Sequence, residues 1–130
     1  SSGNKLTEAQ VVSIYNLIKQ FYSNSEIIEM LNLNIGLTGL NQIRQGKVWK
    51  YLWDREGMMI IPSLKKESGG LSSPTKVDII KQIDNSTDLK YLQSKYGLYA
   101  SDLKRIKERI LWKPVWFIYD NFIISKEKNE

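Results

Sequence analysis

Apolar residues recur along this chain at helical spacing, and the same order of apolar positions then returns in the second half. The offset is first 65 and later 63 positions: Val12, Ile14 and Ile18 become Val77, Ile79 and Ile83, and Leu40, Ile43 and Trp49 become Leu103, Ile106 and Trp112. A small insertion between Leu33 and Leu40 accounts for the change of offset. Because self-similarity at a fixed period marks a repeated structural unit, the pattern predicts two modules related by internal duplication, over residues 1–64 and 73–130, with a linker at 65–72.

The second half predicts three helices. Ser73 and Pro74 form a favourable N-cap and first-turn pair for the first helix. The second helix ends at Gly97, a residue suited to the left-handed conformation that closes a helix. Ser101 is expected to cap the third. The apolar stripes of the three helices are, in order, Val77, Ile80 and Ile83; Leu89, Leu92 and Tyr96; and Leu103, Ile106 and Ile110.

The first half predicts the same three helices. Thr7 opens a helix that runs to about Tyr22, and Glu26 to Leu31 forms the second helix. Asn32 stands where Gly97 stands and is the next best left-handed residue. The turn is two residues longer than its counterpart, and the third helix begins at Thr38 or Gly39 and ends before Gly46.

The fold class that follows is all-α, with two tandem three-helix modules. A long helix, a short helix, a tight turn and a third helix in that order are typical of the helix-turn-helix arrangement, in which the last helix lies in the major groove of DNA. The stretch 62–73 of roughly 12 residues spans at most about 40 Å, a little over one turn of DNA. We therefore expect the two modules to be able to reach successive major grooves.

Two tryptophans follow each third helix. Trp49 and Trp53 correspond to Trp112 and Trp116, and in modules this small we expect these rings to close the core. Base stacking or packing on a nucleic-acid backbone is the alternative. Pro114, between the second pair, is expected to end or kink any helix there.

The net charge of +5 is concentrated at the third helices. Leu40 to Lys50 carries +3 and Leu103 to Lys113 carries +4, so the rest of the chain sums to −2. A solvated helix face explains such charges too, but their recurrence at the same place in both halves favours a surface that faces a polyanion.

Composition narrows the chemistry. The chain has no Cys and no His, which excludes disulfides, thiolate metal sites and imidazole bases, including the histidine of an HNH nuclease. The acidic pairs Asp54 with Glu56 and Asp84 with Asp88 have no counterpart in the other half and no phosphate-binding glycine loop. We therefore expect no enzyme activity, no metal and no cofactor. No apolar run is long enough to span a membrane and no signal peptide is recognised, so a cytoplasmic, nucleoid-associated protein is expected.

Two segments resemble a known family. Residues 91–107, YLQSKYGLYASDLKRIK, resemble a helix-turn-helix core, and residues 40–53, LNQIRQGKVWKYLW, resemble the ending of helix-turn-helix modules that accompany phage and intron-encoded homing endonucleases. In that family the module docks on DNA while a separate HNH or GIY-YIG domain cuts it, and this sequence contains neither nuclease domain. The longer first turn departs from the family pattern, as does Arg109 where the family has Gly.

The third helices supply the candidate DNA contacts. The base-contact candidates are Thr38, Asn41, Gln42, Arg44 and Gln45 in the first half and Tyr99, Ser101, Lys104 and Arg105 in the second. Arg suits guanine, and Asn or Gln suits adenine. The phosphate-contact candidates are Lys47, Lys50, Lys107, Arg109 and Lys113.

The function expected from these patterns is sequence-specific binding of double-stranded DNA by a transcriptional regulator of phage or mobile-element type. One chain with two modules is expected to act as a monomeric pseudo-dimer or as a weak homodimer. Two alternatives remain open. The tryptophans of the two modules form a surface for another protein, such as a transcription or replication component, or the chain is the DNA-docking part of a split homing nuclease.

Overall fold

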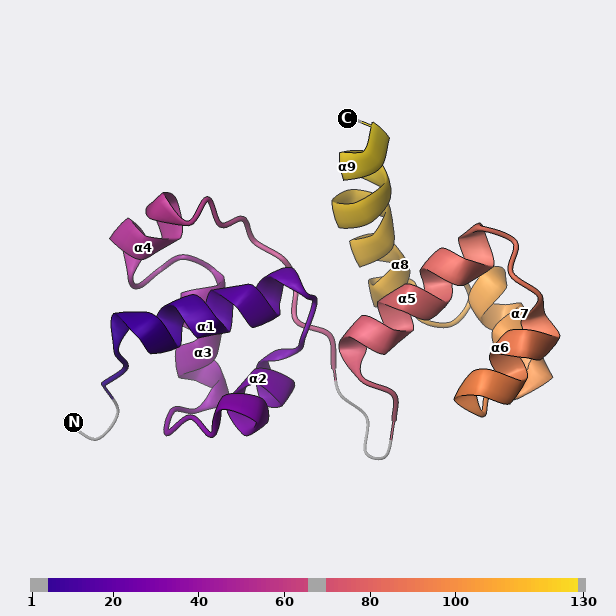
Figure 1. Cartoon of the computed structure of the whole chain (residues 1–130), viewed down its shortest axis with the longest axis horizontal. Helices are drawn as coiled ribbons and strands as arrows, with labels where there is room; N and C mark the ends of the chain where they lie inside the picture. Colours follow the sequence, from indigo (N-terminus) through magenta and orange to yellow (C-terminus); the bar gives the residue numbers. More distant parts are fainter. Residues whose placement is uncertain (1–4, 66–69, 129–130) are drawn as a thin grey trace. The chain divides into compact units, whose positions relative to one another are not determined.

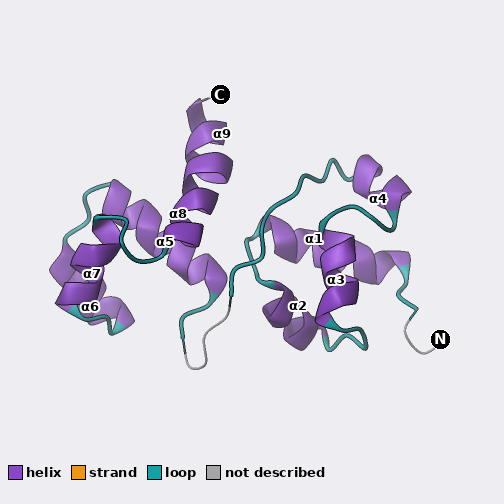
Figure 2. Ribbon diagram, turned by 180° about the vertical axis from the view of Figure 1, so that it is seen from behind, coloured by secondary structure: helices purple, strands orange, loops and turns teal. Residues whose placement is uncertain are grey.

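A computed structural model describes residues 5–65 and 70–128 of the chain. In those residues every regular element is a helix, which confirms the all-α class (Figures 1 and 2). The chain divides into two compact units, Ser1–Ser73 and Pro74–Glu130, and each is described by itself. Residues 66–69, most of the interior of the predicted linker, lie outside the described residues.

The two units share the order and the lengths of their first four helices, which have 12, 8, 8 and 6 residues in each case. The first unit contains α1 (Glu8–Lys19), α2 (Asn24–Leu31), α3 (Leu37–Arg44) and α4 (Lys50–Arg55). The second contains α6 (Leu89–Tyr96), α7 (Ala100–Lys107) and α8 (Lys113–Ile118), preceded by α5 (Ser73–Asp84), which starts at the unit boundary. A π-helical segment, η2 (Tyr119–Ile124), and α9 (Ser125–Lys128) follow. This likeness accompanies the sequence repeat, while a common origin of the two halves stays a prediction.

Local signals set several helix boundaries as predicted. Thr7 accepts a hydrogen bond from the backbone of Gln10, whose side chain accepts one from the backbone of Thr7, so the capping box is confirmed. Asn32 and Gly97 are both left-handed, with φ of 51° and 68°, as expected for the residues that close α2 and α6. Asp88 caps α6 by accepting from the backbone N–H of Lys90.

Other boundaries were predicted incorrectly. α1 ends at Lys19 rather than near Tyr22, because Phe21 turns the chain through a φ of 73°. α2 begins at Asn24, since Ser23 and Glu26 form a capping box of their own. Likewise, α3 begins at Leu37 rather than at Thr38 or Gly39.

The third helix of the second unit also differs from the prediction. α7 begins at Ala100, so Ser101 lies inside the helix and is not its cap. The helix ends at Lys107, and the chain then turns through Arg109 at a φ of 62°. Ile110 therefore lies beyond the helix and is 57% exposed instead of joining the core.

One tryptophan of each pair belongs to a core, as predicted. Trp53 packs edge-on against Tyr15 with ring centroids 6.1 Å apart, and Trp116 packs edge-on against Tyr119 at 5.9 Å. All four side chains are buried. Trp49 and Trp112, which precede α4 and α8, are only half-buried and are both left-handed. Trp49 and Trp112 therefore contribute only part of their rings to the cores.

Pro114 neither ends nor kinks a helix. It lies in the first turn of α8, where its missing N–H leaves no intrahelical bond unmade. The apolar run that begins at Phe117 continues this helix through η2 and into α9. In the first unit the corresponding apolar residues after α4, Met58–Ile61, have no regular structure.

Candidate nucleic-acid interface

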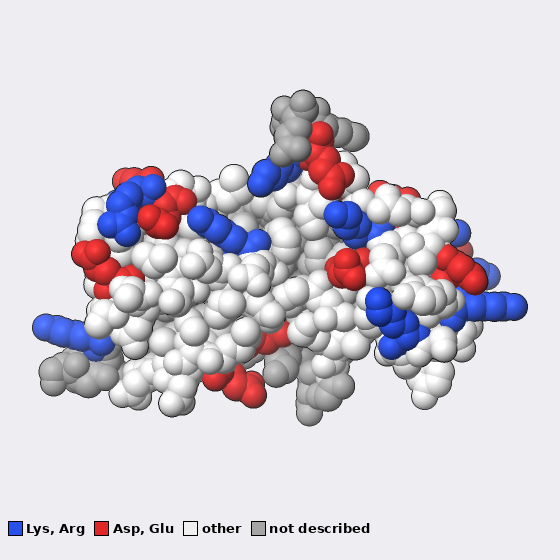
Figure 3. Space-filling view, viewed as in Figure 1, with Lys and Arg blue, Asp and Glu red and all other residues white. Residues whose placement is uncertain are grey.

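α7 has one buried and one cationic face. Leu103 and Ile106, three residues apart, are buried in the core of the second unit. Lys104, Arg105 and Lys107 lie on the remaining circumference of the helix and are exposed. Figure 3 shows basic side chains at the surface in the region of α6 and α7. Burial of the apolar face thus holds the cations in solvent.

The charges of this cationic face have no carboxylate partner among the described residues. In the part of the chain that the structure describes, no ion pair joins Lys104, Arg105 or Lys107 to a carboxylate; the ion pairs of the second unit are Lys81–Glu127 and Arg109–Asp120. Lys113, at the start of α8, is exposed as well. A polyanion that approaches α7 therefore meets free cations.

The N-terminal end of α7 is accessible. Tyr99 is 76% exposed and immediately precedes the helix, while Ser101 is exposed in its first turn. No side chain caps the helix at Tyr99. These positions remain available as base-contact candidates.

Arg109, a predicted phosphate contact, is engaged within the second unit. Its Nη1 and Nη2 donate to the two carboxylate oxygens of Asp120 at 2.6 and 3.2 Å, and its guanidinium lies 4.0 Å from the centre of the Trp116 ring. The hydrogen bonds to Asp120 raise the pKa of Arg109 against a smaller opposing effect of burial. Asp120 thus offsets the charge of Arg109 and takes two of its five N–H donors, which makes Arg109 a weaker phosphate-contact candidate than Lys107 or Lys113.

The exposed face of α3 is polar and uncharged. Thr38, Asn41, Gln42 and Gln45 are spaced so that they share one side of the helix, opposite buried Leu40 and Ile43. The first three are exposed, and Gln45 is half-buried just past the last turn. This side offers amide and hydroxyl groups that both donate and accept hydrogen bonds.

Cations are sparse around α3. Lys47 is exposed after the helix. Lys50 is exposed and forms an ion pair with Asp54 at 3.3 Å, an i,i+4 surface pair that contributes only a few tenths of a kcal/mol and leaves Lys50 able to exchange partners. Both stay phosphate-contact candidates.

Arg44 was predicted to contact bases, and this prediction is wrong. Only 1% of its surface is exposed. Its Nε donates to the carbonyl of Ile61 at 2.5 Å, and its Nη2 donates to the carbonyl of Pro62 at 3.0 Å. Its Nη1 donates both to the carbonyl of Tyr22 at 2.9 Å and to Oδ1 of Asn24 at 3.1 Å. All three guanidinium nitrogens therefore face the protein interior.

The burial of Arg44 lowers its pKa to about 10, although the nearby carboxylate of Glu26 partly opposes the shift. Arg44 therefore remains cationic at neutral pH, held by four oxygen acceptors. A sequence signal for its position did exist. Leu40, Ile43 and Arg44 stand at i, i+3 and i+4, which is the spacing of the buried stripe.

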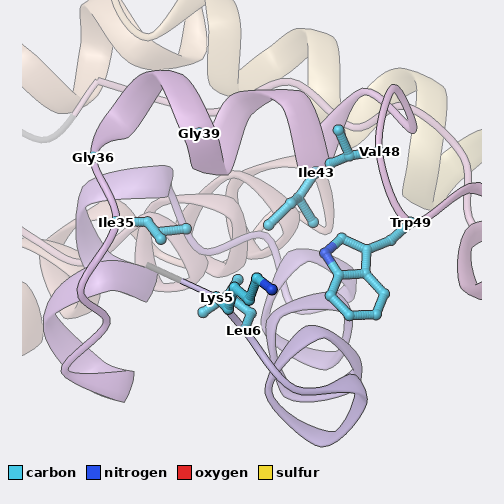
Figure 4. A pocket seen from close by; sticks show the side chains of 8 residues that line it. All are labelled: Lys5, Leu6, Ile35, Gly36, Gly39, Ile43, Val48 and Trp49. Carbon is cyan, nitrogen blue, oxygen red and sulfur yellow. The ribbon is translucent and has the colours of Figure 1, made fainter. Parts of the chain in front are cut away.

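An apolar hollow of about 580 Å³ lies beside α3 in the first unit (Figure 4). Its lining includes Ile35 and Ile43, Leu6 before α1, and the indole of Trp49. Among the described lining residues, Lys5 alone is charged. The sequence pattern does not predict this hollow, because it forms from segments that are distant along the chain.

Other kinds of site receive no support from the geometry. Among the residues described, no three Asp or Glu side chains gather as a metal site would require. No described helix combines the length and apolar character needed to cross a bilayer. Comparison of the chain with family profiles, curated proteins and solved structures yields no match. Interpretation of this surface therefore depends on its own chemistry.

Proposed function

We propose that the chain binds double-stranded DNA sequence-specifically, with α7 and α3 as the helices that enter major grooves. In this proposal each unit is a helix-turn-helix module, with α2 and α3 or α6 and α7 as its paired helices. The resemblance of residues 40–53 and 91–107 to modules of phage and intron-encoded nucleases extends the proposal to a non-enzymatic regulator or recruitment factor of mobile-element type.

The observation that carries the proposal is the cationic face of α7. Three exposed cations on an eight-residue helix lack acidic partners in the described structure, while two apolar residues anchor the opposite face. Such an arrangement raises the local concentration of a polyanion without disturbing the core. Arg105 and Lys104 are suited to the acceptors of guanine, and Lys107 and Lys113 to phosphates.

The α3 face complements this role. Its amide side chains carry no charge but offer many hydrogen-bonding atoms, which suits reading base edges rather than holding phosphates. We therefore assign most of the salt-dependent affinity to the second unit and much of the base reading of the first unit to Thr38, Asn41 and Gln42.

Salt dependence of binding tests the proposal. For the parent protein, the logarithm of the association constant for random-sequence duplex is expected to fall linearly with the logarithm of salt concentration, by about 0.9 per phosphate contact. The triple variant Lys104→Gln, Arg105→Gln, Lys107→Gln should bind more weakly and with a shallower slope.

A charge-matched control uses three exposed lysines outside α7: Lys19→Gln, Lys65→Gln and Lys126→Gln. This control should keep the parent slope more closely than the α7 variant does. Failure of the parent to retain duplex at low salt, or equal losses in the two triple variants, would contradict the proposal.

The alternative of a tryptophan-centred protein surface has less support. Trp53 and Trp116 are buried, so only Trp49 and Trp112 offer part of their rings to a partner. Docking for a separate nuclease chain is compatible with the proposed DNA binding. A neighbouring reading frame with an HNH motif would favour it.

A further inference from the structure

A chain of hydrogen bonds links buried Arg44 to the exposed face of α3. Arg44 Nη1 donates to Oδ1 of Asn24 at 3.1 Å, and Nδ2 of Asn24 donates to Oδ1 of Asn41 at 3.4 Å. Asn24 is itself buried at the start of α2, where its backbone N–H donates to Oγ of Ser63 at 2.8 Å. The chain runs from the interior, through α2, to a solvent-facing residue of α3.

The chemistry of the three side chains determines the direction of every bond. A guanidinium has only donors, so the amide oxygen of Asn24 must face Arg44. The amide nitrogen of Asn24 then faces Asn41 and only donates, so the oxygen of Asn41 must face Asn24. The bond between Asn24 and Asn41 is long, so it orients the Asn41 amide more than it stabilises the fold. The NH₂ group of exposed Asn41 is left pointing away from Asn24.

From this relay we infer that Asn41 is a specificity-determining residue whose amide is preset as an outward hydrogen-bond donor, with Arg44 and Asn24 as positioning residues. The inference rests on the proposed DNA binding. It identifies the kind of base edge that α3 reads: one that presents an acceptor in the major groove.

The groups that each base presents in the major groove determine which bases an outward-facing NH₂ group of Asn41 would favour. Guanine presents O6 and N7 and thymine presents O4, all acceptors, whereas cytosine presents only the N4 donor. Adenine presents the N7 acceptor beside the N6 donor, so an outward NH₂ group can bond to N7 but leaves N6 without an acceptor. The two-bond contact of Asn with adenine needs the amide oxygen to face the base, and here that oxygen faces Asn24. We therefore expect guanine or thymine opposite Asn41, in place of the adenine that residue type alone suggests.

Substitution of Asn24 by aspartate should reverse the orientation of the Asn41 amide while keeping a side chain of nearly the same shape at position 24. The new carboxylate still accepts from Arg44, but it has no donor for Asn41. Asn41 must then turn its NH₂ group inward and its oxygen outward. A selection of bound sequences from random duplexes should show the preference at one position change from guanine or thymine to adenine or cytosine in Asn24→Asp.

Two further variants complete the experiment. Asn16→Asp adds the same charge on an exposed position of α1 and should keep the parent preference. Asn41→Ala should lose discrimination at that one position by about three- to tenfold, which corresponds to one neutral hydrogen bond. If the parent binds duplex while Asn24→Asp keeps its preference, or Asn16→Asp shifts it equally, the inference is overturned and DNA binding stands.

A DNA-free measurement tests the relay itself. In the nitrogen–proton spectrum of the free parent, the side-chain NH₂ of Asn24 should exchange with water more slowly than that of Asn41. In Asn24→Asp the Asn41 NH₂ should become the protected one. Equal, fast exchange of Asn41 in both proteins would overturn the preset orientation. Absence of duplex binding by the parent would instead overturn the proposed function and, with it, the base-reading role.

Discussion

The backbone of Gly46 lies directly against the ring of Trp53. A Cβ at Gly46 would be 2.7 Å from Cε2 and 2.8 Å from Cδ2 of that ring, and Gly46 has a φ of +71°. Arg109, the corresponding position of the second unit, is also left-handed, and its own side chain covers the ring of Trp116. Both units thus place a left-handed residue beside the buried tryptophan, but only the first requires the absence of a side chain.

Gly46→Ala should therefore destabilise the first unit strongly. A left-handed conformation costs an L-residue about 1–2 kcal/mol, and forcing a methyl group against a packed ring adds about 1–3 kcal/mol. Gly57→Ala is the matched control, since Gly57 has a φ of +61° with nothing within 4 Å of a built Cβ. Urea unfolding followed by circular dichroism should show only the conformational loss in the control. Equal losses in the two variants would mean that the ring moves aside freely.

Replacement of Arg44 should cost far more stability than replacement of Arg105. Arg44→Met leaves the buried carbonyl of Ile61 and the buried Oδ1 of Asn24 without their donor, so we expect a loss of at least about 2 kcal/mol in the free energy of unfolding. Arg105→Met changes an exposed side chain and should alter stability by no more than about 0.5 kcal/mol, while weakening duplex binding. An Arg44→Met protein as stable as the parent would show that these contacts contribute little to folding.

Tyr119 should make the second unit sensitive to alkali. Its hydroxyl donates to Oδ2 of Asp84 at 2.6 Å, and burial, followed by this bond, raises the pKa of the phenol. Because the folded state favours the neutral phenol, the resulting stability is present below the unfolded pKa of about 10 and declines as the pH rises above it. Tyr119→Phe should cost about 1 kcal/mol at neutral pH and should reduce the alkaline decline.

Urea unfolding at neutral pH and at about pH 10.5 measures this effect. Tyr99→Phe, at an exposed tyrosine, is the control and should match the parent at both pH values. An unchanged alkaline decline in Tyr119→Phe would assign it to other groups.

Arg109→Gly should relieve backbone strain in the second unit but remove stabilising side-chain contacts. Glycine relieves a left-handed strain of about 1–2 kcal/mol, but it removes an exposed ion pair and a stacked cation, each worth about 1 kcal/mol or less. The net change should stay within about 1 kcal/mol. Arg109→Ala loses the same contacts and keeps the strain, so it should be less stable than Arg109→Gly by the strain energy. Thermal unfolding of the pair measures this difference, and equal stability would show that Arg109 is unstrained.

The amino-acid sequence by itself determined the helical class and many helix ends. Thr7, Asn32 and Gly97 act through backbone groups within a few residues, so their roles follow from local chemistry. The burial of Trp53 and Trp116 could also be predicted from the sequence. Apolar spacing and the need of a small module for a core both indicate it.

Only the tertiary structure decided which cations face solvent. Arg44 is a surface candidate by residue type, yet carbonyls 17 and 18 positions further along the chain fold onto it and take its donors. Arg109 stays exposed but pairs with Asp120, 11 positions away, whereas Arg105 on α7 forms no ion pair with a described carboxylate. Local pattern controls caps and helix faces because their partners lie within a turn or two. The partners of a long charged side chain lie wherever the remaining chain packs, and that is a property of the whole fold.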